Sequence, residues 1–153
     1  MANKLSEPLV FAPPAIAAAV LAVDTQGEGF YEITNDARHF LQRSGGRDGV
    51  LLAFVRHTSA SLTIQENADP DVQRDLTTAL RRLAPQNAGW VHDAEGPDDM
   101  PAHVKTLISG VSLHVPVARG GLELGTWQGI YLVEHRARPH RRTVALHFLG
   151  SRA

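Results

Sequence analysis

Three histidines in this chain, His57, His92 and His103, are the residues best suited to metal or proton chemistry. Neutral imidazole nitrogens bind divalent ions, and zinc is the first candidate where imidazole ligands dominate. His92 and His103 flank a carboxylate-rich loop, residues 93–99. The pair therefore indicates a divalent metal site. The spacing matches no known zinc motif, however, and a hydrogen-bonded core imidazole is the structural alternative at each position.

Glu134 ends a segment with the alternation of a β-strand. The alternation in residues 129–134 places Glu134 on the same face as Ile130 and Leu132. If that face points inward, the carboxylate must be paired or bound to a metal, because an isolated buried charge costs several kcal/mol. The alternative is a strand that ends here and leaves Glu134 exposed. We favour the functional interpretation.

The segment His57-Thr58-Ser59-Ala60 follows one predicted buried strand and precedes another. Polar residues at the end of a core strand often face a cleft. His57 could bind a metal or move a proton, and Thr58 and Ser59 could donate hydrogen bonds to phosphate oxygens. A tight turn, in which the two hydroxyls cap backbone groups, is the structural alternative.

Polar residues also crowd a predicted helix start, residues 65–71. The free amides of a helix N-terminus suit an anion. Here Asp69 is better explained as a helix cap and Asn67 as an Asx turn, and three carboxylates would repel a phosphate. The structural interpretation is preferred for this segment taken alone.

Two further segments could line a pocket. A glycine stands close to Trp127 and Gln128, which suggests close backbone approach and a flat apolar wall, although ordinary packing of the tryptophan explains the pattern equally well. Four arginines crowd the turn after Glu134: Arg136, Arg138, Arg141 and Arg142. They could hold a phosphate or form a solvated basic hairpin.

The elements that must position these residues indicate an α+β fold with antiparallel β-sheets and about three helices. Residues 15–23 fit either a helix or a strand. Helices are expected from Thr34 to Gly45-Gly46, from Asp69-Pro70 to Pro85, and from Asp99 to Gly110. Strand-like patterns occupy residues 29–33, 50–56, 61–65, 111–117, 122–124, 128–135 and 142–149.

The helical patterns also predict which side chains face the core. The third helix should turn Val104, Leu107 and Ile108 inward. The second helix should bury one apolar stripe, made of Val72, Leu76, Ala79, Leu80 and Leu83.

Length and composition indicate one domain, residues 1–153, with residues 1–8 as a loose tail. The 15 lysines and arginines nearly balance the 16 acidic residues, and aromatic residues make up only 6%, which argues against a nucleic-acid partner. The apolar stretch 9–23 is too short to span a membrane. The absence of cysteine excludes disulfides and thiolate sites and fits a cytoplasmic enzyme.

Taken together, the motifs resemble the YjbQ-like family, also called the secondary thiamine-phosphate synthase enzyme family. The resemblance covers residues 25–150 with the motifs in family order, and the combination of HTSA, LGTWQ and a following glutamate is specific. The residues that carry it are His57-Thr58-Ser59-Ala60, Glu66-Asn67, Asp69-Pro70, Asp75, His92, Asp98-Asp99, Ala102-His103, Leu124-Gly125-Thr126-Trp127-Gln128 and Glu134.

The resemblance implies an antiparallel α+β fold, a homotrimer and a polar cleft that can bind a divalent metal ion, Zn or Mg. It also implies a weak thiamine-phosphate synthase activity. In that reaction a hydroxymethyl-pyrimidine diphosphate alkylates the nitrogen of a thiazole phosphate, and pyrophosphate leaves. Many members carry Asn where this chain has Met100, and the basic turn after Glu134 is richer in arginine here.

Carried over by position, the resemblance implies that His57, His92 and His103 are the metal or phosphate ligands. Glu134 would orient a ligand or act as a base, with His57 as a second catalytic residue. Implied substrate contacts are Thr58, Ser59, Asn67, Trp127, Gln128 and Arg142.

These expectations combine into a metal-assisted enzyme that acts on a phosphorylated heterocycle and has no nucleic-acid or membrane partner. Two alternatives stay open: a non-catalytic binder or sensor of a phosphorylated small molecule, and a metal-dependent hydrolase.

Overall fold

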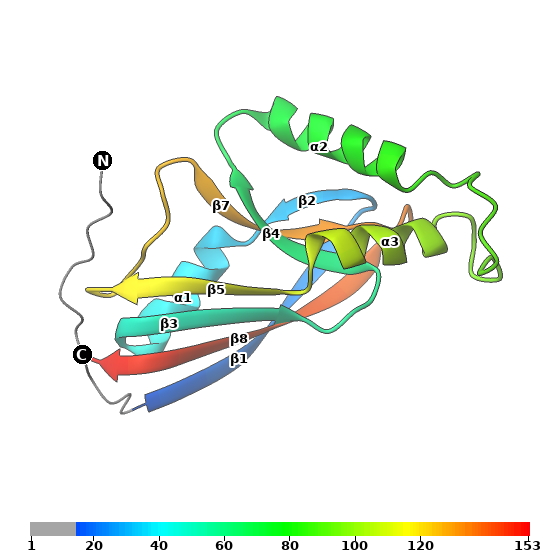
Figure 1. The fold of residues 1–153 in the computed structure, drawn as a ribbon. Coiled ribbons are helices and arrows are strands. Elements are labelled where there is room, and N and C mark those ends of the chain that lie inside the picture. Colours follow the sequence, from blue (N-terminus) through cyan, green and yellow to red (C-terminus); the bar gives the residue numbers. More distant parts are fainter. Residues whose placement is uncertain (1–14) are drawn as a thin grey trace, which may run out of the picture.

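The computed structural model describes residues 15–153 as two antiparallel sheets and three helices, which confirms the expected α+β class (Figure 1). The predicted tail, residues 1–8, lies outside the described residues. The helices are α1 (Thr34–Ser44), α2 (Pro70–Leu83) and α3 (Asp99–Ser109). The strands are β1 (Ala15–Thr25), β2 (Gly29–Glu32), β3 (Gly46–Val55), β4 (Ala60–Glu66), β5 (Ser112–Ala118), β6 (Gly121–Leu122), β7 (Gln128–Glu134) and β8 (His140–Arg152).

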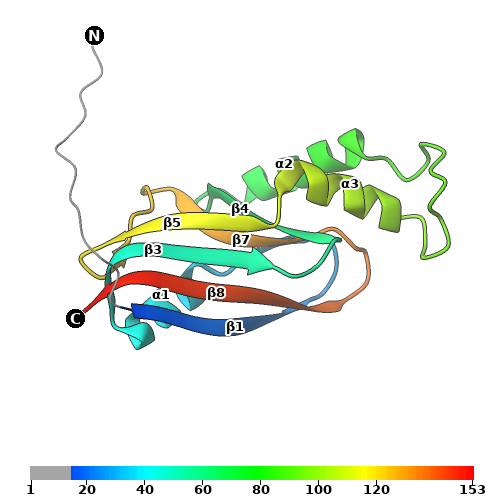
Figure 2. The ribbon, with the colours of Figure 1, turned by 60° about the horizontal axis from the view of Figure 1, so that its bottom comes forward.

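The larger sheet has the strand order β1-β8-β3-β5-β6, and the smaller sheet has the order β2-β7-β4. Helix α1 packs behind the larger sheet, whereas α2 and α3 lie together beside the smaller one (Figures 1 and 2). Residues 15–23, which fitted either a helix or a strand, belong to β1 and pair with β8. Within residues 15–153, no helix has the length and apolar character needed to cross a membrane.

The core lies between the inner faces of the two sheets, where side chains alternate in and out along each strand. Leu51, Val144 and Phe148 from the larger sheet meet Ile130 and Leu132 from the smaller one, all almost completely buried. Burial of the 130–132 face carries Glu134 inward with it, as the alternation predicted.

Local sequence signals predicted most of the helix ends correctly. Asp69 caps α2 by accepting a hydrogen bond from the Asp71 amide at 2.9 Å, and Pro70 occupies the first turn. Gly45 ends α1 in the left-handed conformation at φ 66°. The helix expected from Thr34 does begin there, and the Thr34 hydroxyl accepts a hydrogen bond from the Ile130 amide at 2.9 Å rather than capping α1.

The predicted burial of the other two helices was partly wrong. No residue of α2 is fully buried, and Leu83 at the end of its apolar stripe is 63% exposed. In α3, Leu107 and Ile108 are 83% and 55% exposed, while Asp99 and Lys105 are buried. The helix is rotated so that polar residues face the protein, because they form ion pairs there.

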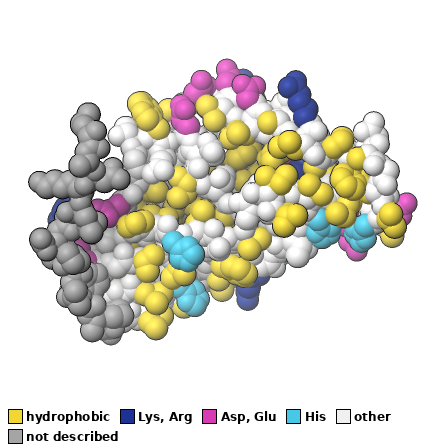
Figure 3. Space-filling view, in the orientation of Figure 1, with side chains coloured by type: hydrophobic (Ala, Val, Ile, Leu, Met, Phe, Trp, Pro, Cys, Tyr) yellow, Lys and Arg dark blue, Asp and Glu magenta, His cyan; other side chains and the backbone are white. Residues whose placement is uncertain are grey.

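The face of the larger sheet that points away from α1 is apolar and uncovered within the described residues. Ile16, Val20 and Phe54 on this face are 71%, 59% and 47% exposed. Figure 3 shows hydrophobic and histidine side chains spread across this region. We call it the outer sheet face; by strand register it comprises Ile16, Ala18, Val20, Val50, Leu52, Phe54, His114, Ala145, His147 and Leu149.

Candidate metal and anion site

His92, Asp99 and His103 form the cluster best suited to a metal ion. Each offers one ligand atom, and these atoms all lie within 4.8 Å of one another. Oδ2 of Asp99 lies 2.8 Å from Nε2 of His92 and 3.4 Å from Nε2 of His103. Asp99 and His103 stand one turn apart on α3, and His92 comes from the loop before it. Figure 3 shows histidine and acidic side chains side by side at the right-hand end of the molecule.

Neighbouring groups orient two of these three side chains. Nδ1 of His103 donates to the carbonyl oxygen of Thr58 at 3.0 Å, which leaves its Nε2 lone pair for a ligand role. Arg136 binds Oδ1 of Asp99, so Oδ2 is the oxygen that faces the two imidazoles. Supports of this kind are typical of metal ligands, whose outer partners fix both tautomer and orientation.

The donor set fits a divalent ion. Two imidazole nitrogens and one carboxylate oxygen match three of the four ligands of a catalytic zinc site and leave one position open. Magnesium prefers oxygen ligands, so this set favours zinc between the two expected metals.

Glu134 and Arg142 form a second, buried group. The Glu134 side chain is fully buried; its Oε2 accepts from Nε of Arg142 at 2.7 Å and from Oγ1 of Thr25 at 2.9 Å. Its Oε1 accepts from Nη2 of Arg142 at 2.6 Å and from the Arg136 amide at 2.9 Å. Burial alone would raise the pKa of Glu134, but these donors, chiefly Arg142, hold it below the usual value. With both oxygens occupied, Glu134 is placed to position Arg142 rather than to accept a substrate proton.

His57 lies beside this second group and outside the metal cluster. Its Nε2 accepts a hydrogen bond from the Thr143 amide at 3.0 Å. Because an amide can only donate, the neutral ring must carry its proton on Nδ1. Burial, aided by the positive charge of Arg142, lowers the pKa of His57. A neutral ring in this tautomer is a hydrogen-bond donor and has no lone pair left for a metal.

An open hollow of about 470 Å³ brings the HTSA segment and Arg142 together. His57, Thr58 and Ser59 line it, with Arg56 and Arg142. Nη2 of Arg142 donates to Oγ of Ser59 at 3.0 Å, and Nη1 has no partner among the described residues. The hollow therefore offers cationic and neutral donors to an anion.

Two contacts join the metal cluster to this hollow. Thr58, which lines the hollow, accepts the hydrogen bond from His103. Arg136 binds Glu134 through its amide and both Asp98 and Asp99 through its guanidinium. The two groups are thus neighbours, and the basic turn after Glu134 connects them.

The three other predicted substrate contacts lie elsewhere. Asn67 donates to Oε1 of Glu32 at 3.1 Å, Gln128 accepts from the Gly125 amide at 2.8 Å, and Trp127 is 63% exposed. In the register of the smaller sheet, Gln128 pairs at one end of β7 and Glu134 at the other. Six residues of strand separate these ends by about 20 Å. Within one chain, these residues do not share a pocket with Glu134.

Comparison with known proteins identifies this architecture. The pattern of the family described as UPF0047 protein YjbQ-like matches residues 19–151. The chain belongs to this family. A UPF0047 protein of Synechocystis sp. is 46% identical over 132 residues, covering 86% of this chain and 90% of that protein. The YjbQ protein of Escherichia coli O157:H7 is 42% identical over 117 residues, covering 76% and 85%.

Several solved structures share the fold. An uncharacterised YjbQ/UPF0047 protein of Clostridium acetobutylicum superposes with a TM-score of 0.78 at 37% identity, over 85% of this chain and 98% of that one. A hypothetical protein of Aeropyrum pernix gives a TM-score of 0.82 at 32% identity, over 88% and 99%.

The sequence did not predict the roles of several polar residues in this protein. Asp99 was noted in an acidic loop, at a helix start and in a family motif, but not as a metal ligand, although its spacing of four from His103 was a usable signal. Arg136 was counted with a basic turn that could equally have been solvated. Thr25, which donates to Glu134, and His135, whose ring contacts the Ser61 hydroxyl, had no local signal, because these partners are distant in sequence.

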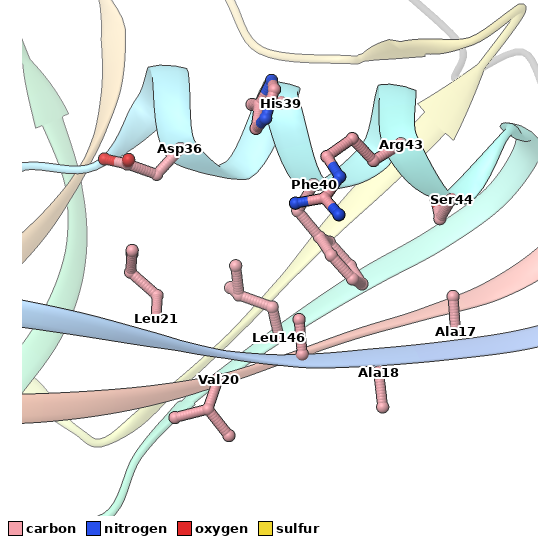
Figure 4. Close-up of a pocket in the computed structure, with 11 residues that line it drawn as sticks. Ala17, Ala18, Val20, Leu21, Asp36, His39, Phe40, Arg43, Ser44 and Leu146 are labelled. Carbon is pink, nitrogen blue, oxygen red and sulfur yellow. The ribbon is translucent and has the colours of Figure 1, made fainter.

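A separate groove of about 350 Å³ runs between α1 and β1 (Figure 4). Leu21 and Leu146 lie on its sheet side, and Phe40 reaches toward them from α1, which also carries Asp36 and Arg43. None of the predicted site residues lines this groove. It therefore does not add to the candidate site.

Proposed function

We propose that this protein is a metal-assisted enzyme acting on a phosphorylated heterocycle, with thiamine-phosphate synthase-type alkyl transfer as the specific reaction. The observation that supports the proposal is the contact between the His92–Asp99–His103 cluster and the donor-lined hollow at Arg142. A diphosphate that leaves a carbon centre needs neutralising charge on its oxygens. A divalent ion held by the cluster, together with Arg142, would supply that charge from neighbouring positions.

A divalent ion at His92, Asp99 and His103 would supply positive charge to the leaving diphosphate. Arg142 and the Nδ1–H of His57 would hold further phosphate oxygens, with the hydroxyls of Thr58 and Ser59 beside them. Glu134 keeps the Arg142 guanidinium in place.

The proposed reaction needs no base, which agrees with the occupied oxygens of Glu134. A carbon–nitrogen bond forms as the thiazole nitrogen attacks, and the carbon–oxygen bond to the diphosphate breaks with its electron pair on the leaving oxygen. No proton has to be removed from the attacking nitrogen. We therefore assign Glu134 a positioning role in place of general base catalysis.

Metal content and turnover test the proposal together. Zinc should bind near one ion per chain at pH 7.5 and be lost at pH 5.5, since imidazole ligands must be neutral. His103→Ala should remove both zinc and product formation from the two thiamine precursors. The exposed His39→Ala is the matched control and should retain both. Zinc below a tenth of stoichiometric at both pH values would refute metal assistance.

The same assay separates the alternatives. Tight, saturable precursor binding without turnover would indicate a non-catalytic binder or sensor. Phosphate release from generic esters, lost in His103→Ala, would indicate a metal-dependent hydrolase, because the open metal position can also activate water.

The proposed working form is a homotrimer, located in the cytoplasm. The outer sheet face supports self-association, since exposed apolar patches commonly mark interfaces. Association could also bring Trp127 and Gln128 of one copy near the hollow of another. Light scattering should give about 50 kDa, three times the 16.6 kDa chain. Val20→Lys should lower that mass, whereas Asn35→Lys on exposed α1 should not; a monomeric wild type would refute the trimer.

A further inference from the structure

A second polar hollow, of about 240 Å³, lies on the other side of α3 from the metal cluster. Asp98, Pro101 and Lys105 line it from one face of α3, whereas Asp99 and His103 lie on another face. The end of α2 and the segment after β7 complete it (Figure 1). The full lining is Glu28, Arg81, Ala84, Pro85, Gln86, Asp98, Pro101, Lys105, His135 and Ala137.

His135, one of these lining residues, has a buried ring nitrogen, Nδ1, that forms no hydrogen bond with the described residues. The residue is 2% exposed, and its Nε2 lies 2.7 Å from Oγ of Ser61. Its Nδ1 has no hydrogen-bond partner within residues 15–153. The Ser61 hydroxyl has no other acceptor in the described part of the chain, so donating to Nε2 is the arrangement that satisfies most groups. Nδ1 then carries a proton and is a buried donor without an acceptor. Such a group is costly unless something fills the site.

The charged residues around His135 also have unused donors. Lys105 is 4% exposed and pairs with Oε1 of Glu28, and Nε of Arg81 pairs with Oε2 of the same carboxylate at 2.7 Å. Two cations therefore share one anion. No other partner of Lys105 or Arg81 is recorded within the described residues, so ammonium and guanidinium protons are left over.

Asp98, the other acid in the lining, does not cancel this surplus. Its Oδ2 accepts from Nε of Arg136 at 3.1 Å and from the Ala137 amide at 2.8 Å. Asp98 is thus an anion already paired with Arg136. The hollow keeps about one unit of positive charge.

We propose that this hollow binds the carboxylate group of a small organic acid. The N–H of His135 and the spare protons of Lys105 and Arg81 would surround the two carboxylate oxygens. One surplus positive charge matches a monoanion better than a doubly charged phosphate. The inference does not depend on the function proposed above, since none of these residues belongs to the metal cluster or the Arg142 hollow.

Acetate is the probe for this site. Titration of the full-length, ¹⁵N-labelled protein at pH 7.5 should shift the Nδ1–H signal of His135 saturably, at constant ionic strength. Loss of that signal in His135→Gln assigns it. Chloride should have no saturable effect, and inorganic phosphate should bind more weakly than acetate. If the Nδ1–H signal did not change in acetate, the proposal would be overturned, and an ordered water would be the partner of Nδ1. Tighter binding of phosphate would overturn the carboxylate assignment.

Two variants test the charge surplus. Arg81→Gln should weaken acetate binding about tenfold, as expected for a charged hydrogen-bond donor. Its side chain is largely exposed, so the fold should tolerate the change. Arg74→Gln, on the same helix and more exposed, is the matched control and should bind like the wild type. Lys105→Met should abolish binding where it folds. If Arg81→Gln bound acetate as tightly as the wild type, the proposed charge complementarity would be wrong.

Discussion

Acid should destabilise this protein through His135 before it titrates the buried carboxylates. Burial, reinforced by the positive charge of Lys105, lowers the pKa of His135 from 6.5 to about 4. In the unfolded chain the imidazole takes up a proton near pH 6.5, whereas the folded protein resists it down to about pH 4. Unfolding therefore binds a proton between these values. The stability contribution is intact above pH 6.5 and is lost as the pH falls toward 4.

The size of the effect follows from the two pKa values of His135. The full gap between 6.5 and about 4 corresponds to about 3.4 kcal/mol of unfolding free energy. At pH 5.0 the unfolded histidine is almost fully protonated and the folded one is still mostly neutral. About 2 kcal/mol of the wild-type stability should therefore be gone at pH 5.0 relative to pH 7.5.

Chemical denaturation followed by circular dichroism at pH 7.5 and 5.0 measures this loss. A chelator in every sample removes any contribution from metal binding. His135→Gln should lower stability at pH 7.5, but its further loss at pH 5.0 should be about 2 kcal/mol smaller than that of the wild type. His39→Gln, on an exposed position of α1, should keep the wild-type dependence. Equal pH dependence in His135→Gln and the wild type would refute the reasoning.

Three other changes have defined outcomes. Glu134→Gln should cost about 3 kcal/mol in denaturant unfolding because it leaves the Arg142 charge buried, and adding Arg142→Met should restore part of the loss; a neutral single variant would contradict the ion-pair argument. Gly150→Ala should cost about 2 kcal/mol or more because its Cβ would overlap a carbonyl of β3, whereas Gly121→Ala has room and should be near neutral in thermal melts. Arg136→Gln should lower the zinc affinity about tenfold in competition titrations, because it releases Oδ1 of the ligand Asp99. An unchanged zinc affinity would show that Arg136 is not needed to orient Asp99.

Patterns with a short period were sufficient to predict most of the strands and the inward face of Glu134, but they left residues 15–23, now part of β1, open between helix and strand. Side chains alternate strictly along a strand, so the inward Ile130 and Leu132 required an inward Glu134. The start of α2 was equally readable because Asp69 and Pro70 act within one turn. Each of these patterns depends only on residues close together in the sequence, so the sequence alone predicts the structure there.

The arrangement of the site needed contacts that no local pattern contains. His103 belongs with His92, but whether His57 joins them depends on how β3 and α3 approach, and the Thr143 amide occupies the His57 ring instead. The motif around Trp127 precedes Glu134 closely in sequence, yet an extended strand carries the two apart. Apolar periodicity also misled for Leu107, because ion pairs decided which face of α3 turns inward.

The charges of the site explain why metal and anion binding should be coupled. The ion-paired residues of the site, which leave out the exposed Arg56, are Asp98, Asp99, Glu134, Arg136 and Arg142. They carry three negative and two positive charges, so this ion-pair network has one excess negative charge. That excess opposes a phosphate in the neighbouring hollow. A divalent ion would reverse it to one positive charge. Inorganic phosphate should therefore bind at least tenfold more tightly with zinc than with chelator, as about 1.4 kcal/mol of attraction would give. Equal phosphate affinity in both conditions would mean that the two groups act separately, and the proposed transfer reaction would lose its physical basis.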